Sequence, residues 1–261
     1  NVADVRLEGM TLTGGYYPGK NWGTFTGAGA DILNSAVELS DCAIVSNTIA
    51  GTGHQNSYGG GIRCYHSQVA IRACDLRRNT AQGSGVYESQ GGGMYIEGYS
   101  GVTVEESVLG ENATFGGSTG ARFGGGISYK GTALLMRNCL VYGNAATGTV
   151  SAGGGIYCAG DGGKYYVAGV AHLENCTVAH NLHQGIRRST GAVSMTNCIV
   201  WGNATNVVGE ITAATSDIGD EGVAGEGCIH ADPLFKNAER FDFRLRATSP
   251  CINKGANAVW M

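Results

Sequence analysis

Tyrosines and cations recur at matching places in this 261-residue sequence. Aromatic rings offer flat apolar surfaces, and cations make charge-assisted hydrogen bonds to carboxylates. Together they suit sugars, above all acidic sugars, so a polysaccharide or a host or cell-surface glycan is the expected partner. Tyr and Arg are also common on ordinary solvated sheet faces, which is the alternative reading. The predicted binding residues are Arg63, Tyr65, Tyr95, Lys130, Tyr157 and Arg187.

Carboxylates offer a second kind of chemistry. Asp31 and Glu97 belong to the same predicted face, and glycoside hydrolysis uses a pair of carboxylates. They lie two repeats apart, about 9–10 Å along the repeat axis, which is the upper limit for an inverting pair. Asp31 sits in a different column from Glu97 and has no supporting His or Asp. They are therefore the catalytic candidates of the alternative hypothesis, a polysaccharide lyase or glycoside hydrolase acting on an acidic polysaccharide, while the main expectation is a protein without enzymatic activity.

A third group of acids lies near the C-terminus. Asp217, Asp220 and Glu221 are close together in a glycine-containing stretch, and carboxylates are the ligands that Ca²⁺ prefers. Three acids in such a loop are more often simply solvated. The sequence therefore predicts no cofactor, with Ca²⁺ as the alternative.

The elements that must position these side chains are repeats. Each repeat has an apolar residue, then Cys, then an apolar residue, then Asn. The Cys position is occupied at 42, 74, 139, 176 and 198, with Ser107 filling the gap, and the Asn position at 47, 79, 112, 144, 181 and 203. The first four of these asparagines are 32 or 33 residues apart, a period that indicates a solenoid.

The residue types decide which solenoid this is. The apolar runs are short, alternate with a period of two, and end at Gly, Asn or Ser, which indicates strands and not helices. Each repeat contains three such runs. The predicted fold is therefore all-β, a right-handed parallel β-helix with three short strands per turn. The Cys and Asn positions become inward columns, and Asn suits a corner because it tolerates left-handed backbone angles and can form amide ladders.

Strand alternation then assigns the outward residues. If Ile62 and Cys64 point inward, Arg63 and Tyr65 point outward. One outward column reads Asp31, Arg63, Tyr95, Ser128, Tyr157 and Arg187, and the next reads Leu33, Tyr65, Glu97, Lys130, Ala159 and Ser189. The connectors 48–58, 80–90 and 113–123 have equal length and are expected to line one edge of this face.

The repeat pattern also predicts the domain organisation. Residues 1–203 form the β-helix turns, and residues 204–261 form the final turns and a C-terminal cap, because the end of a solenoid exposes unpaired strand edges. Cys228 and Cys251 lie outside the repeat frame, and the sequence leaves open whether they form a disulfide.

Composition excludes several classes of function. Net charge is −4 and only 15% of residues are charged, so nucleic acid is not an expected partner. No run of about 20 apolar residues is present, so direct membrane insertion is not expected. The chain begins at Asn1 inside a repeat-like pattern without a signal peptide, which predicts a part of a longer chain.

Two motifs carry a resemblance to known families. The Gly-Gly-Gly-Ile clusters at 59–62 and 124–127, with the endings Asn-Thr-Ala at 79–81 and Asn-Ala-Ala at 144–146, resemble the repeats of chlamydial polymorphic outer-membrane proteins. Those repeats carry Gly-Gly-Ala-Ile and Phe-x-x-Asn, whereas this chain has a third glycine and an aliphatic residue in place of Phe.

The tail is similar to the end of right-handed β-helix domains in large bacterial surface and secreted proteins. The matching segments are Asp-Pro-Leu-Phe at 232–235, Phe-Arg-Leu at 243–245 and Ser-Pro-Cys-Ile-Asn-Lys-Gly at 249–255. The resemblance implies a secreted or bacterial cell-surface location and a role in adhesion, glycan binding or rigid presentation. It supplies no catalytic residues.

Overall fold

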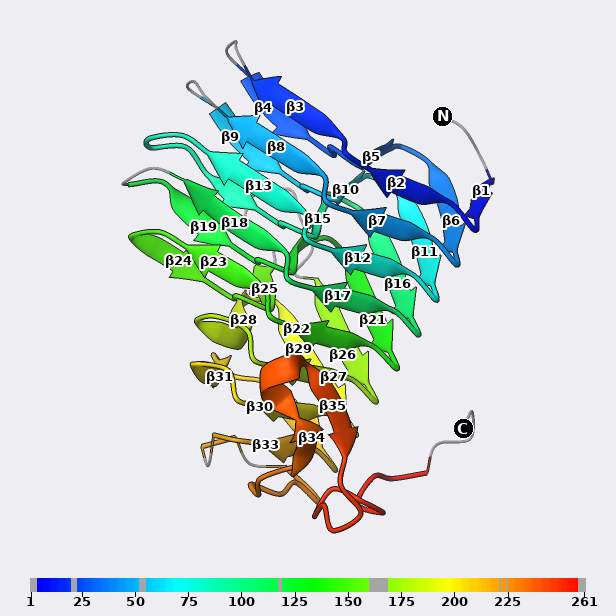
Figure 1. Cartoon of the computed structure of the whole chain (residues 1–261), viewed down its shortest axis with the longest axis vertical. Helices are drawn as coiled ribbons and strands as arrows, with labels where there is room; N and C mark the ends of the chain where they lie inside the picture. The colour runs from blue at the N-terminus through cyan, green and yellow to red at the C-terminus, as the bar shows by residue number, and fades with distance from the viewer. Residues whose placement is uncertain are drawn as a thin grey trace.

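The computed structural model describes residues 4–19, 23–51, 55–116, 119–159, 169–220, 222–223 and 225–257. They form the predicted right-handed parallel β-helix, in which the chain crosses the front of Figure 1 from right to left and returns behind. Strand neighbours in the five large sheets are parallel, and one short antiparallel hairpin lies near the C-terminus.

Three long sheets form the walls of the solenoid. The first wall follows the glycine clusters and consists of β5 (Ala30–Leu33), β10 (Ile62–Tyr65), β15 (Met94–Glu97), β20 (Ile127–Lys130), β25 (Ile156–Ala159), β28 (Gln184–Thr190) and β31 (Thr205–Val208). The second wall consists of β1 (Val5–Glu8), β6 (Ala36–Ser40), β11 (Gln68–Arg72), β16 (Gly101–Glu105), β21 (Ala133–Arg137), β26 (Val170–Glu174), β29 (Ala192–Thr196) and β32 (Thr212–Ala214). The third wall consists of β2 (Thr11–Thr13), β7 (Ala43–Val45), β12 (Asp75–Arg77), β17 (Val108–Gly110), β22 (Leu140–Tyr142), β27 (Thr177–Ala179), β30 (Ile199–Trp201) and β33 (Asp217–Ile218).

The connectors, predicted only to line one edge of the first wall, form strands of their own. They build two further five-stranded sheets, which we call the flap, on the left of Figure 1. One consists of β3 (Tyr16–Gly19), β8 (Thr48–Gly51), β13 (Thr80–Gly83), β18 (Ala113–Gly116) and β23 (Ala145–Thr147). The other consists of β4 (Gly23–Thr26), β9 (Gln55–Tyr58), β14 (Ser89–Gln90), β19 (Ala121–Phe123) and β24 (Val150–Ala152). Turns with the flap therefore carry two strands more than the three predicted.

The asparagine column forms a continuous ladder, as the sequence predicted. In each turn the side-chain amide and the backbone N–H both donate to the Oδ1 of the next asparagine. For Asn79 to Asn112 both distances are 3.0 Å. The same Asn79 amide also donates to the carbonyl of Ile44 at 2.7 Å. The ladder runs from Asn47 to Asn203, continues to Asn206, and ends on the carboxylate of Asp220 at 3.2 Å.

The expected reason for asparagine at the corner is wrong in one respect. The left-handed residue is the one before each asparagine, with φ of +57° at both Ser46 and Arg78. A second left-handed residue precedes each member of the Cys column, for example Asp41 and Ala73. Asparagine is therefore required for its hydrogen bonds, while the bend itself is made by its neighbour.

The cysteine column packs as small apolar side chains. Its members are 1–3% exposed, and all nine cysteines of the chain are free thiols. Ser107 replaces Cys by accepting the backbone N–H of Cys74 at 3.0 Å, and Ser216 plays the same part for Cys198 one turn later. Burial raises the pKa of Cys64 and Cys158, on the inner side of the first wall, to about 12.

The C-terminal residues close the solenoid in two ways. Ile211, Val223 and Cys228 pack against the core beside the last strands. The hairpin of β34 (Phe235–Asn237), the 3₁₀ helix η1 (Ala238–Arg240) and β35 (Asp242–Leu245) then lies in front of the third wall in Figure 1. Its Phe241 ring lies 4.7 Å from the ring of Tyr142, so the cap is anchored to the side of the coil as well as to its end.

We predict that Asn112→Leu strongly destabilises the protein. The substitution removes the acceptor of the buried Asn79 backbone N–H. It also removes one hydrogen bond each from the Asn79 side-chain amide, the Leu76 carbonyl and Asn144 Oδ1. Unpaired buried groups cost about 1–3 kcal/mol each, so denaturant unfolding should show a loss of at least about 3 kcal/mol. Asn257→Leu in the exposed tail is the control and should change stability by less than about 0.5 kcal/mol. Equal unfolding midpoints for wild type and Asn112→Leu would contradict the claim that the hydrogen bonds of the ladder stabilise the fold.

Candidate functional site

The predicted outward columns on the first wall are correct in register. Strand pairing aligns Asp31, Arg63, Tyr95, Ser128, Tyr157 and Arg187. It also aligns Leu33, Tyr65, Glu97 and Lys130. A bulge after Cys158 then places Thr190 opposite Ala159, whereas the predicted column has Ser189 at that place.

Two of the predicted binding rings are not open to a ligand. Tyr95 is only 1% exposed and Tyr157 only 7% exposed. The Tyr58 ring stacks on Tyr95 at 4.6 Å, and the Phe123 ring stacks on Tyr157 at 4.3 Å. The expectation that Tyr95 and Tyr157 present free stacking surfaces is therefore wrong, because residues from the flap cover them. Burial, together with nearby Glu97, holds the pKa of Tyr95 well above its usual value.

The flap reaches the first wall through the glycine clusters. Gly59 and Gly124 have positive φ, and a Cβ at either would meet backbone atoms of the following strand at 2.4 Å or less. The chain therefore turns sharply, and the residue before each cluster lies against the first wall one turn later. Gln90 follows the same rule, because its Oε1 accepts from Ser128 at 3.0 Å. The sequence signal was the large residue before each cluster, at positions 58, 90 and 123.

The two candidate catalytic acids share one arginine. Arg63 lies between Asp31 and Glu97, with nitrogen–oxygen distances of 3.4 and 3.9 Å, and its side chain is 14% exposed. Its guanidinium carbon also lies 4.7 Å from the centre of the Tyr65 ring. A pair of hydrolytic carboxylates needs a sugar and water between them, whereas here a guanidinium occupies that position. Tyr65, Lys130 and Arg187 remain partly exposed on this wall.

Two of the three predicted calcium ligands accept hydrogen bonds within the C-terminal turns. Asp217 is buried and accepts from the Cys251 thiol at 2.9 Å and from the Ala231 N–H at 3.2 Å. Asp220 accepts from the Val207 N–H at 2.6 Å as well as from the asparagine ladder. Glu221 lies outside the described residues. Within the described ranges, no three His, Cys, Asp or Glu residues come together as a metal site.

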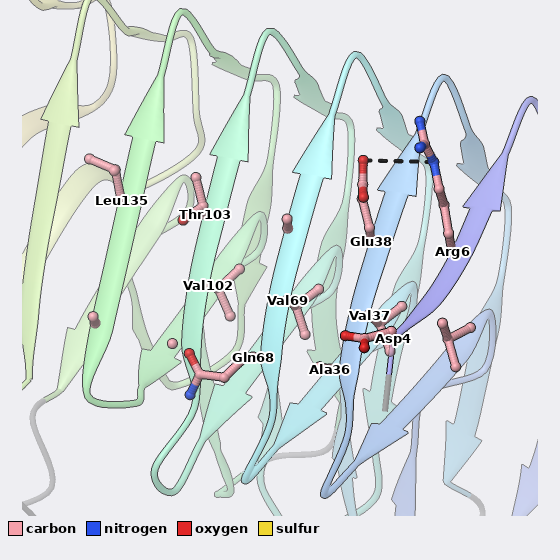
Figure 2. A pocket seen from close by; sticks show the side chains of 14 residues that line it. Asp4, Arg6, Ala36, Val37, Glu38, Gln68, Val69, Val102, Thr103 and Leu135 are labelled. Atoms are coloured by element: carbon pink, nitrogen blue, oxygen red, sulfur yellow. Dashed lines mark ion pairs between the residues drawn. The ribbon is translucent and has the colours of Figure 1, made fainter. Parts of the chain in front are cut away.

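An open lengthwise groove lies on the second wall, for which the sequence predicts no site. A shallow trough of about 750 Å³ crosses its outer face from β1 to β21. Figure 2 shows its lining: small or medium side chains on consecutive strands, with few large ones. Two outward columns supply it, Ala36, Gln68, Gly101 and Ala133, and then Glu38, Ala70, Thr103 and Leu135. In the sequence this surface corresponds to small residues where strands usually carry large ones, a pattern that by itself indicates no function.

Charged groups border the trough. Near its N-terminal end Arg6 lies 3.8 Å from Glu38, the ion pair drawn in Figure 2. Two residues further along the strands, Arg137 bridges Glu105 at 3.4 Å and Glu174 at 2.6 Å. Burial alone would raise the pKa of Glu174, but hydrogen bonds from Arg137 and His172 outweigh it and lower that pKa below its usual value. The trough is thus an apolar strip with a charged edge.

Comparison of the chain with family models, with curated proteins and with solved structures gives no match. The resemblance to surface-protein repeats therefore stays a prediction. Among the described residues no helix has the length and apolar character needed to span a membrane.

We predict a pH-dependent effect of Glu174→Gln. Because the pKa of Glu174 is lowered on folding, its stabilisation is present above the ordinary carboxyl pKa of about 4.3 and is lost as the pH falls through the folded value. At pH 7 the variant should lose about 1 kcal/mol of unfolding free energy, and the difference from wild type should vanish in acid. Exposed Glu239→Gln is the control, expected to show no difference at either pH. A Glu174→Gln deficit that persists undiminished in acid would contradict the ion-pair explanation.

Proposed function

We propose that the chain is a secreted or cell-surface β-helix domain that binds an extended glycan chain along the trough of the second wall. The observation that carries the proposal is the lengthwise continuity of the trough over consecutive strands. A binding role of this kind agrees with the adhesion or glycan binding that the tail and repeat motifs led us to expect.

The geometry favours a ligand that is itself repetitive. Equivalent positions on neighbouring strands lie about 4.8 Å apart, so a chain parallel to the solenoid axis meets a similar surface at each step. The outward-facing Ala and Gly residues of the floor, with the strand backbone between them, suit the apolar faces of sugar rings. Gln68, Thr103 and Glu38 offer hydrogen-bonding groups for hydroxyls at the edge of that floor. An apolar lining with a few placed polar groups is typical of small-molecule sites.

The first wall is the second place where a glycan could bind. Of the six predicted binding residues, Tyr65, Lys130 and Arg187 keep partial exposure, and Arg63 is largely engaged by Asp31 and Glu97. An acidic glycan would need the two cations, which lie on β20 and β28. The second wall is favoured because its surface is open and continuous.

The alternative of a polysaccharide lyase or glycoside hydrolase across the first wall has less support. Its two acids hold an arginine between them, and the flap covers the neighbouring rings. Rigid presentation without a ligand is the remaining account, and it requires only the stacked sheets.

We predict that filling the trough abolishes glycan retention. Ala70 is exposed on the trough floor, so Ala70→Trp should fold normally while blocking the groove. Affinity electrophoresis against a panel of neutral and acidic polysaccharides measures retention. A glycan that retards the wild type should retard Ala70→Trp at least about tenfold less.

Two controls locate the site. Ser189→Trp adds the same bulk on the first wall, away from the trough, and should leave retention unchanged. Lys130→Ala with Arg187→Ala should also leave it unchanged. Loss of retention in that double variant, but not in Ala70→Trp, would move the site to the first wall. Failure of the wild type to bind any glycan would leave only rigid presentation.

A further inference from the structure

A Ser–His–Glu cluster lies on the second wall, beyond the trough. The outward column that supplies the trough with Ala70, Thr103 and Leu135 continues, strand by strand, into His172 and then Ser194. His172 Nδ1 lies 2.6 Å from Ser194 Oγ, and His172 Nε2 lies 2.7 Å from Glu174 Oε1. Glu174 Oε2 is in turn held by Arg137 Nε at 2.6 Å.

Neighbouring parallel strands place these groups. His172 and Glu174 are two residues apart on β26, so both point to the outer face. Ser194 is the Cα partner of His172 on β29. Val193 and Met195, on either side of Ser194, are buried in the core and hold its strand in place. The His172 side chain is 35% exposed, so the cluster is accessible from solvent.

The hydrogen bonds determine which nitrogen of neutral His172 carries the proton. An ionised carboxylate can only accept hydrogen bonds, so the contact with Glu174 requires the proton on Nε2. The ionised form of Glu174 is favoured by one hydrogen bond from Arg137 and one from His172. Nδ1 then presents a lone pair to the Ser194 hydroxyl. A serine that donates to a histidine oriented by a carboxylate is the arrangement that activates a nucleophile.

We propose that Ser194 is a nucleophile for carboxylic esters, with His172 as its general base and Glu174 as the positioning residue. This goes beyond glycan binding, since it adds a reaction. The activity toward small esters does not depend on the trough. The identification of the natural substrate, an acyl group ester-linked to the bound glycan, does rest on the proposed function.

The reaction balances with water as the only co-reactant. Ser194 Oγ attacks the ester carbonyl carbon while its proton passes to His172 Nδ1. The tetrahedral intermediate collapses, the carbon–oxygen bond to the alcohol breaks, and the imidazolium returns the proton to the leaving alcohol. Water then attacks the acyl-serine with the same help from His172. This second step releases the carboxylic acid and restores the Ser194 hydroxyl.

The site offers only weak stabilisation of the negatively charged oxygen of the tetrahedral intermediate. Thr212 on β32 is the Cα partner of Ser194 and the next residue of the column, and its exposed hydroxyl is one donor on the same face. One hydroxyl is a weaker donor set than the two or more aimed donors of a full oxyanion hole. We therefore expect slow turnover and ready trapping of the serine, so covalent labelling is the more sensitive measurement.

The test is labelling of the full chain with a fluorophosphonate probe, with peptide mass spectrometry to find the modified residue, beside hydrolysis of p-nitrophenyl acetate. The expected result is one label per chain on Ser194, lost in Ser194→Ala and His172→Ala. Glu174→Gln should slow labelling at least about tenfold while keeping the serine, because the amide no longer enforces the Nε2 proton. Ser189→Ala, an exposed serine outside the cluster, is the matched control and should label like wild type.

Several results would overturn the proposal. These are labelling that survives Ser194→Ala, an unchanged rate in Glu174→Gln, or an unlabelled and inactive folded wild type. In each case the cluster would be a polar cross-link between two strands. Glycan retention in the Ala70→Trp variant is measured separately, so failure of the esterase proposal and failure of glycan binding give different patterns.

Discussion

The hydrogen-bonded asparagine ladder is the interaction on which the rest of the structure depends. Each rung ties a backbone N–H and a side-chain amide of one turn to one oxygen of the next. Because the same residue is tied in successive turns, the register of all three walls follows from it. The left-handed residue before each asparagine and the buried Cys column then repeat at the same height. The insertion between Asn144 and Asn181 lengthens one turn without shifting the ladder or the pairing of β21 with β26 on the second wall.

That constraint explains how much of the molecule could be predicted from the sequence. The columns through Cys74 and Asn79 followed from spacing, because stacked positions share a residue type, and the column through Arg63 followed from strand alternation beside them. The flap could not be predicted in the same way, since its strands lack the apolar alternation on which strand prediction relies. Tyr95 and Tyr157 were assigned correctly to an outward column, but whether a ring is covered depends on residues from another turn.

The candidate sites on the second wall were harder to predict for a different reason. A trough is defined by side chains that are small, and small residues in a strand carry no positive signal of function. The Ser194 cluster joins residues from two strands across a shortened repeat, 22 residues apart. Only the register shows that they are neighbours. The flap closes part of the first wall, so the second wall is where stacked side chains form a continuous open surface, and both proposals use it.

Native-state hydrogen exchange tests the central claim, that the ladder sets the register and stability of the solenoid. The backbone N–H groups of Asn79, Asn112 and Asn144 should exchange only by global unfolding, with the highest protection in the chain. The amide of exposed Val86, in the turn between β13 and β14, should exchange through local opening. Exchange of the three asparagine amides as fast as that of Val86 would contradict the account, since the ladder would then open without the solenoid.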